Sequence, residues 1–255
     1  PLGGDIVLPF AGDELACAEV AAGSPPLLHL WRHRKALVLG LRDRKLPRAS
    51  EAMAAFRQEG YSVMVRNSGG AAVPLDEGVL NVTMVVPARP GAVDVRREFA
   101  AMADFVRRAV HRLDPALEIA VGEVGGAYCP GDYDLSAGGR KFCGIAQRRK
   151  LGAYAVQAFI VAEGGGEDRA RTAARFYRMA AGDGAGQTGL TVLPESTASL
   201  REWSDRVTAA GLAESFKDLL RKQADIRSEA RHYDGYDGRM LEAMIGRMKA
   251  RYDTD

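Results

Sequence analysis

The 255-residue sequence predicts a mixed α/β (α+β) fold that ends in a helical segment. Short apolar runs with strand-like alternation recur between glycine-bearing turns, and amphipathic stretches with helical periodicity lie between them. Beyond residues 182–189 the pattern becomes charged and helical. With 47% hydrophobic residues, a chain of this length can bury a sizeable core. We therefore expect one main domain over residues 1–195 and a helical lobe over residues 196–255 that packs on the same domain.

Residues that break or cap helices, together with periodicity, place the individual elements. Pro25-Pro26 end a first helix, and Gly60 ends a second helix that Ser50 caps. The longest apolar stripe covers residues 95–113 and predicts a helix packed on the sheet. The expected strands or apolar segments are residues 27–30, 36–41, 61–65, 71–73, 80–86, 117–121, 141–146 and 154–162. The expected helices are residues 12–22, 50–60, 95–113, 168–181, 196–210, 212–223 and 232–252.

Composition limits the classes of function. Lysine and arginine number 35 against 33 aspartate and glutamate, a net charge of +2, so no strong field favours a nucleic acid or a membrane surface. Three cysteines without CxxC spacing indicate a reducing compartment and predict a cytoplasmic protein. No apolar run reaches about 18–20 residues, and the sequence does not begin with a charged segment followed by a long apolar one. Neither membrane insertion nor secretion is therefore expected.

The four histidines are scattered along the chain. Only His29 and His33 share a spacing of four, in a region that is predicted to be extended. We therefore expect no metal ion, and no histidine is placed in sequence to form a visible Cys-His pair.

The segment around Cys129 contains the sharpest chemical signal. Cys129 follows Tyr128 and precedes Pro130-Gly131, and a thiol on such a loop is accessible to a substrate. Cys17 lies on a predicted helix and Cys143 within an apolar strand, so both are better explained as small buried side chains. Cys129 is the predicted nucleophile, and Cys143 is the second choice.

Two further features support acyl-transfer chemistry. Lys141 lies twelve residues after Cys129, in an apolar strand next to Phe142, where an ammonium interacts strongly with charge that develops on a substrate. A solvated strand lysine is the alternative. The loop of residues 66–70 can offer backbone N–H groups to an oxyanion or pack close to an acyl chain, although a Gly-Gly pair is more often a simple turn.

Two separated segments resemble the lipoate-attachment superfamily of lipoyl and octanoyl transferases and lipoate-protein ligases, which share a fold with biotin ligases. The first, Arg66-Asn67-Ser68-Gly69-Gly70-Ala71-Ala72-Val73-Pro74-Leu75-Asp76 continued by Gly78-Val79-Leu80-Asn81, is similar to Arg-x-Ser-Gly-Gly-Gly-Ala-Val-x-His-Asp. The second, Asp134-Leu135-Ser136 and Gly139-Arg140-Lys141-Phe142-Cys143-Gly144-Ile145-Ala146-Gln147, is similar to Asp-Leu and Gly-Lys-Lys-Ile-x-Gly-x-Ala-Gln. The similarity extends from Trp31 to Ser199.

The resemblance implies a largely antiparallel sheet flanked by helices, of the biotin/lipoate protein ligase type, with residues 1–195 as an acyltransferase catalytic domain. The run from Tyr128 to Ser136 resembles a run found in one branch of the superfamily. Enzymes of this branch are amidotransferases that move an octanoyl (or lipoyl) group. Their donor is the glycine cleavage H protein, and their acceptors are lipoyl domains of 2-oxoacid dehydrogenase complexes. The branch's acyl-thioester cysteine falls on Cys129, and no cofactor is implied.

The resemblance also implies roles for the other motif residues. Lys141 orients the acyl carbonyl or stabilises its developing oxyanion, and the loop of residues 66–70 with Asp76 shapes the acyl tunnel. The implied substrate-binding residues are Arg66, Asn67, Ser68, Gly69, Gly70, Asp76, Asn81, Tyr128, Gly131 and Asp134.

Two departures from the family motif bear on mechanism. Leu75 stands where ligases have histidine, and Ala71 replaces the third glycine, changes that favour a transferase over an ATP-using ligase. Three alternatives remain open: an octanoyl transferase that draws on acyl carrier protein, an ATP-dependent lipoate ligase, and a non-catalytic protein that binds lipoyl domains.

Overall fold

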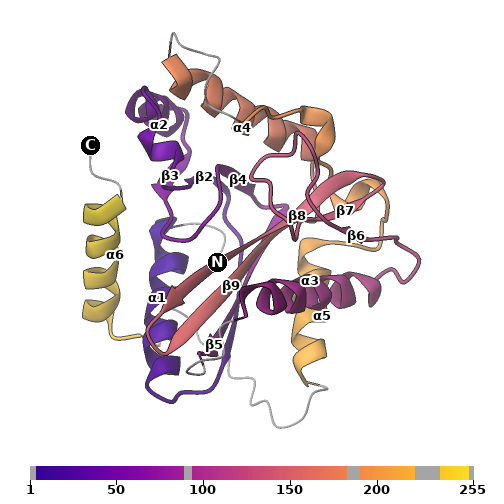
Figure 1. The fold of residues 1–255 in the computed structure, drawn as a ribbon, viewed down its shortest axis with the longest axis horizontal. Coiled ribbons are helices and arrows are strands. Elements are labelled where there is room, and N and C mark those ends of the chain that lie inside the picture. The colour runs from indigo at the N-terminus through magenta and orange to yellow at the C-terminus, as the bar shows by residue number, and fades with distance from the viewer. Residues whose placement is uncertain (1–3, 89–93, 183–189, 222–235, 253–255) are drawn as a thin grey trace.

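The computed structural model describes residues 4–88, 94–182, 190–221 and 236–252, which form two sheets covered by helices (Figure 1). The larger sheet has the strand order β1 (Leu27–Trp31), β5 (Val79–Pro87), β9 (Ala153–Val161), β8 (Arg140–Lys150), β7 (Leu135–Ala137) and β6 (Ala120–Val121). The smaller sheet has the order β3 (Ser62–Val65), β2 (Lys35–Leu39) and β4 (Val73–Asp76). Among these strands, every pairing is antiparallel except that of β2 with β3. The predicted mixed, largely antiparallel architecture is confirmed.

Helices cover both faces of the larger sheet. One face packs against α3 (Val95–His111) and α5 (Ala209–Arg221), whose Phe105 and Phe216 rings meet edge to face at 4.9 Å. The other face packs against α1 (Val7–Ala21), and α6 (Gly238–Tyr252) lies against the outer side of α1 (Figure 1). The helices α2 (Ala49–Gln58) and α4 (Gly166–Ala181) pack together beside the smaller sheet. The predicted division at residue 195 stays a prediction.

Strand alternation separates two hydrophobic cores. Leu80, Val82 and Ile160 point toward α3 and α5, whereas Val79 and Phe159 point toward α1 and the smaller sheet. Since successive strand residues face opposite sides of a sheet, every second residue of β5 and β9 lines the space beneath α1. This space holds the candidate site.

The prediction of a helix over residues 196–210 is wrong. Short 3-10 helices cover Pro194–Ser196 and Leu200–Glu202, and α5 begins only at Ala209. Between the two 3-10 helices the chain is extended: Thr197 pairs with Lys141, and the Ala198 amide donates to the Lys141 carbonyl at 3.0 Å. Pairing with β8 and burial of this segment override its helical pattern.

Other element boundaries differ from the predictions. The first helix begins at Val7 rather than residue 12, with Pro9 in its first turns, where proline is tolerated. The segment 117–121 is a strand only at Ala120–Val121. Parts of the predicted helices 212–223 and 232–252 lie outside the described residues.

Candidate active site

Cys129 lies on the loop that leads into β7, and its backbone is unusual. Its φ of +48° makes it the single non-glycine residue in the left-handed region among the described residues. Such a conformation is costly for a residue with a side chain and persists where the surroundings enforce it. The preceding Tyr128 is fully buried and stacks on Phe159 at 5.6 Å, which anchors the loop. Cys129 itself is 8% exposed.

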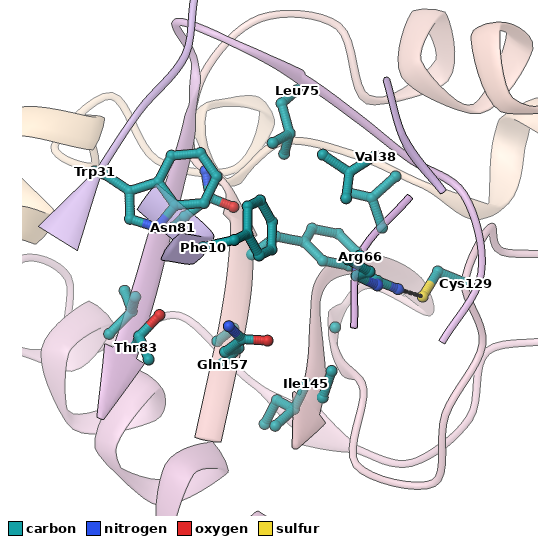
Figure 2. A pocket seen from close by; sticks show the side chains of 16 residues that line it. Phe10, Trp31, Val38, Arg66, Leu75, Asn81, Thr83, Cys129, Ile145 and Gln157 are labelled. Carbon is teal, nitrogen blue, oxygen red and sulfur yellow. Dashed lines mark hydrogen bonds between the residues drawn. The ribbon is translucent and has the colours of Figure 1, made fainter. Parts of the chain in front are cut away.

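The Cys129 sulfur accepts two hydrogen bonds from the loop of residues 66–71, and Figure 2 shows the one from Arg66. The Ala71 amide donates at 3.2 Å and the Arg66 Nη2 at 3.3 Å. Both N–H groups point at the sulfur, and the thiolate is the nucleophilic form of a cysteine. Gly70 has a φ of +102°, and a Cβ there would lie 2.9 Å from the sulfur. Space beside the nucleophile therefore depends on the absence of a side chain at residue 70.

A buried network positions the loop that supplies these donors. Arg66 also donates to the Ala71 carbonyl at 2.8 Å, which closes the loop on itself. The next amide, that of Ala72, donates to the Tyr177 hydroxyl at 3.0 Å, and this hydroxyl donates to Asp43 at 2.9 Å. Burial raises the pKa of Asp43, although hydrogen bonds from Gly40 and Tyr177 oppose the shift. The loop is therefore fixed from the 3-10 helix of Asp43–Lys45, from α4 and by its own arginine.

Lys141 is fully buried and holds the nucleophile loop from the opposite side. Its ammonium donates to the Tyr128 carbonyl at 3.0 Å and to the Cys129 carbonyl at 2.5 Å, and it pairs with Asp134 at 2.8 Å. An ammonium has three protons, so these protein acceptors use all of them. In this arrangement Lys141 is a positioning residue, and the predicted contact with an acyl carbonyl requires one of these bonds to be exchanged.

The partner of Lys141 is an equally buried carboxylate. Burial raises the pKa of Asp134 to about 6, while the charge and hydrogen bond of Lys141 oppose the shift. The Gly131 amide donates to the same carboxylate oxygen as Lys141, Asp134 Oδ2, at 3.1 Å. Gly131 and Asp134 therefore belong to the same loop support as Tyr128.

A cavity opens beside the sulfur, with about 470 Å³ of empty space that includes an opening to solvent (Figure 2). Its walls come from α1, both sheets and the nucleophile loop, and they are mostly apolar. The lining side chains include Phe10, Trp31, Val38, Arg66, Val73, Leu75, Asn81, Thr83, Cys129, Ile145, Gln157 and Phe159.

The structure brings most of the predicted site residues together, in three groups. Arg66, Asn81 and Cys129 line the cavity, and Gly70 lies beside the sulfur. Tyr128, Gly131, Asp134 and Lys141 form the loop support described above. The third group is the rest of the loop that follows Arg66. Ser68 is buried and Gly69 is exposed, and the side-chain amide of Asn67 donates to the Glu14 carboxylate at 2.8 Å. Because Arg148 and Lys150 also pair with this carboxylate, the pKa of Glu14 is lowered although burial alone raises it.

Asp76 is not brought into the cavity. Its carboxylate accepts two hydrogen bonds from Arg169, at 2.8 and 2.5 Å, and one from the Gly78 amide at 2.8 Å. A bidentate arginine pair of this kind uses both carboxylate oxygens. The geometry makes Asp76 a support for the turn between β4 and β5 and for α4.

Several residues of the site carry no local sequence signal. Asp43 and Tyr177 meet across 134 residues, and Phe10, Thr83 and Gln157 reach the cavity from three separate elements. Neither their spacing nor their neighbours differ from those of ordinary core or surface residues. Gly40 is similar, because a Cβ there would clash with the Gly70 carbonyl, a contact visible only in the fold.

The other two cysteines are buried away from the cavity lining. Burial raises the pKa of Cys17 to about 12, and the nearby Asp13 and Glu14 add to the shift. Cys143 faces the α3 and α5 core, and burial also raises the pKa of its thiol. Both are poor nucleophiles in this setting.

Metal and membrane sites were predicted to be absent. Within the part of the chain that the structure describes, no three His, Cys, Asp or Glu side chains are grouped so that they could hold a metal ion. None of the described helices combines the length and the apolar character that crossing a membrane requires.

Comparison with known proteins identifies the family. Residues 5–221 match the model of the lipoyl protein ligase A/B catalytic domain. An octanoyl-[GcvH]:protein N-octanoyltransferase from Anoxybacillus flavithermus is 39% identical over 91% of this chain and 87% of its own. The enzyme of the same name from Bacillus velezensis is 44% identical over 76% of this chain and 68% of its own. A lipoyl-[GcvH]:protein N-lipoyltransferase from Listeria monocytogenes is 37% identical over 69% of this chain and 63% of its own.

A solved structure shows the same fold at much lower sequence identity. The crystal structure of lipoate-protein ligase A bound with ATP aligns with a TM-score of 0.70 and 19% identity, and it covers 97% of this chain and 91% of that one. Together with the family match, this alignment confirms the ligase-like architecture. The chain belongs to the lipoyl protein ligase A/B catalytic-domain family.

Proposed function

We propose that this protein is an octanoyl amidotransferase, which moves an octanoyl (or lipoyl) group from a lysine of the glycine cleavage H protein to lysines of lipoyl domains. One observation carries the proposal: Cys129, whose sulfur accepts from two N–H donors, lines a largely apolar cavity. The names of the 39% and 44% identical relatives describe the same acyl transfer.

The first half-reaction forms an acyl-enzyme. The Cys129 thiolate attacks the acyl carbonyl carbon of the donor amide, a C–S bond forms, and the C–N bond breaks. The departing lysine amine takes up a proton. The space beside Gly70 is where the carbonyl approaches, and the acyl chain occupies the cavity.

The second half-reaction reverses these bonds with a different amine. A lysine of a lipoyl domain of a 2-oxoacid dehydrogenase complex attacks the thioester carbonyl, a C–N bond forms, and the C–S bond breaks. The amine loses its proton and the thiolate is regenerated. Because one amide is exchanged for another, the overall free-energy change is close to zero, and the thioester is the higher-energy intermediate.

The surrounding residues prepare the nucleophile. Arg66 and the Ala71 amide donate hydrogen bonds to the sulfur and are placed to stabilise negative charge on it when the C–S bond breaks. Lys141 fixes the carbonyls of Tyr128 and Cys129, so that the strained loop keeps the sulfur at the cavity. We assign Lys141 a positioning role and propose that it exchanges one acceptor for the acyl carbonyl.

The proposal includes a cytoplasmic location, which the three free thiols support. It involves no metal, nucleotide or other cofactor.

The test is an incubation with octanoylated H protein without ATP, followed by intact mass measurement. We expect one octanoyl adduct that hydroxylamine removes, present in wild type and Cys143→Ala and absent in Cys129→Ala. Passage of the group to an apo lipoyl domain completes the cycle. If octanoyl-acyl carrier protein is the sole effective donor, or if transfer requires ATP and releases pyrophosphate, the amidotransferase proposal is wrong. If Cys143→Ala abolishes the adduct, the nucleophile is misassigned.

A further inference from the structure

Three polar side chains stand in the otherwise apolar wall of the cavity, away from the nucleophile. These are Asn81 and Thr83 on β5 and Gln157 on β9 (Figure 2). A saturated hydrocarbon chain offers none of them a hydrogen-bond partner.

Strand register places these residues relative to the nucleophile. Asn81, Phe159 and Gly144 lie side by side across β5, β9 and β8, and Thr83, Gln157 and Ala146 form the next row on the same face. Lys141, which holds the Cys129 loop, lies next to Gly144. Strand β5 lies two strand spacings from β8, a distance of about 10 Å. The row of Thr83 and Gln157 lies two residues, about 7 Å, along the strands from the row of Asn81 and Phe159. The polar side chains therefore face the distal part of an acyl chain bound to Cys129.

Asn81 has an unused donor. It is 8% exposed, and its Nδ2 has no hydrogen-bond partner among the described residues. A buried donor without a partner is costly unless a ligand supplies an acceptor. Trp31 pairs with Asn81 in the strand register, and Phe10 meets the Trp31 ring at 5.5 Å. Both rings line the same cavity.

The second row is held by a buried carboxylate outside the cavity lining. Asp13 accepts hydrogen bonds from Thr83 Oγ1 at 2.8 Å and from Gln157 Nε2 at 2.9 Å, and it also pairs with His29. Asp13 thereby fixes both side chains, so the polar row is a built feature of the wall. Reorienting them to suit an alkyl chain would break these bonds.

We propose that Asn81, Thr83 and Gln157 form a specificity site for the distal part of the acyl chain, and that this site favours a chain bearing sulfur over a saturated one. It rests on the proposed function in taking the cavity as the acyl site. A sulfur atom accepts a weak hydrogen bond, and sulfur packs favourably against aromatic rings such as Phe10 and Trp31. The lipoyl group carries sulfur in the distal part of the same eight-carbon chain.

The test measures binding of free lipoate and free octanoate to wild type by calorimetry, which requires no protein donor. We expect wild type to bind lipoate more tightly. Asn81→Leu should lower the lipoate-to-octanoate affinity ratio by about three- to tenfold, the range of one hydrogen bond. Thr83→Val, which keeps the shape of the side chain, should lower the ratio less. Replacing an unpartnered buried amide by leucine does not remove a hydrogen bond within the protein, so Asn81→Leu is expected to fold.

Val38→Ala is the matched control, because it removes apolar contact from the same cavity for both acids. Val38→Ala should weaken the binding of both acids and leave the lipoate-to-octanoate affinity ratio unchanged. An unchanged ratio in Asn81→Leu, or tighter binding of octanoate than lipoate to wild type, overturns the specificity site. Because binding does not depend on the H protein, these results are separate from failure of acyl transfer, which would count against the proposed function alone.

Discussion

The amide of Ala71 donates to the sulfur of Cys129 over 3.2 Å, although the two residues are 58 positions apart. This bond joins the first family motif, which contains Ala71, to the run from Tyr128 to Ser136, which contains Cys129. The backbone of the first motif thus acts on the sulfur of the predicted nucleophile. The loop of residues 66–71 acts on the sulfur through the Ala71 hydrogen bond and through the space that Gly70 leaves beside it. Its part in shaping the acyl tunnel stays a prediction.

Gly70→Ala should abolish or greatly reduce acyl-enzyme formation. A Cβ at residue 70 would contact the Arg66 guanidinium and lie 2.9 Å from the sulfur, and the φ of +102° is unfavourable for alanine. The substitution therefore fills the space through which a carbonyl approaches and disturbs the Arg66 donor. The measurement is the rate of octanoyl adduct formation by intact mass.

Gly69→Ala is the control for this experiment. A Cβ at residue 69 meets no atom within 4 Å, and the residue is not in the left-handed region. It should acylate at close to the wild-type rate. Equal rates for both variants would show that access at residue 70 does not limit the reaction.

Lys141→Met should destabilise the protein by about 3–5 kcal/mol, the usual cost of removing one partner of a buried ion pair. It leaves the Asp134 carboxylate buried without its cation, and the carbonyls of Tyr128 and Cys129 lose their donor. Urea unfolding measures the loss.

The double variant Lys141→Met/Asp134→Leu separates stability from positioning. Removing the orphaned carboxylate should recover part of the lost stability. Acyl-enzyme formation should stay low, because the Cys129 carbonyl still lacks its donor. Recovery of activity together with stability would mean that Lys141 contributes only to folding.

Alkylation should distinguish the three cysteines in the native protein. Cys129 is reachable from the cavity opening and has two donors to its sulfur, whereas burial raises the pKa of Cys17 and of Cys143. We expect iodoacetamide to add one label to native wild type and none to Cys129→Ala. Three labels should appear after denaturation. Fast native labelling of Cys143 would contradict the burial that the structure assigns to it.

The sequence predicts the fold class well because it has local signals, whereas the role of Cys129 as nucleophile stays a prediction. Strand alternation over residues 80–86 and the stripe over residues 95–113 become β5 and α3 almost unchanged. Cys129 stands out from Cys17 and Cys143 by its Pro-Gly loop, and the structure places it at the cavity. These inferences need only neighbouring residues.

The rest depends on long-range contacts that a single sequence does not display. Thr197 and Ala198 are held extended by pairing with Lys141, so the helical pattern of residues 196–210 is misleading. Asp76 belongs to the first motif, yet its carboxylate accepts hydrogen bonds from Arg169, 93 residues away. Tyr177 and Asp43 support the glycine loop through a contact across 134 residues. Periodicity carries no information about such pairs.

The buried Asp134 should give the stability of the protein a distinctive pH dependence. Burial raises its pKa in the folded protein to about 6, above the ordinary value for an aspartate of about 3.9. Between these two values the folded state holds a proton that the unfolded chain has released. Stability contributed by this group therefore falls as pH rises from about 4 to about 6, and it stays constant above about 7.

Asp134→Asn provides the reference, because it removes the titrating group and keeps a side chain of the same shape. The free energy of unfolding of wild type minus that of Asp134→Asn should decrease between about pH 4.5 and pH 6.5 and then level off. Urea unfolding at intermediate pH values measures this difference, in which titrations common to both proteins cancel. A difference that increases with pH over this range would mean that Lys141 lowers the Asp134 pKa below its ordinary value, so that the ion pair outweighs the cost of burial.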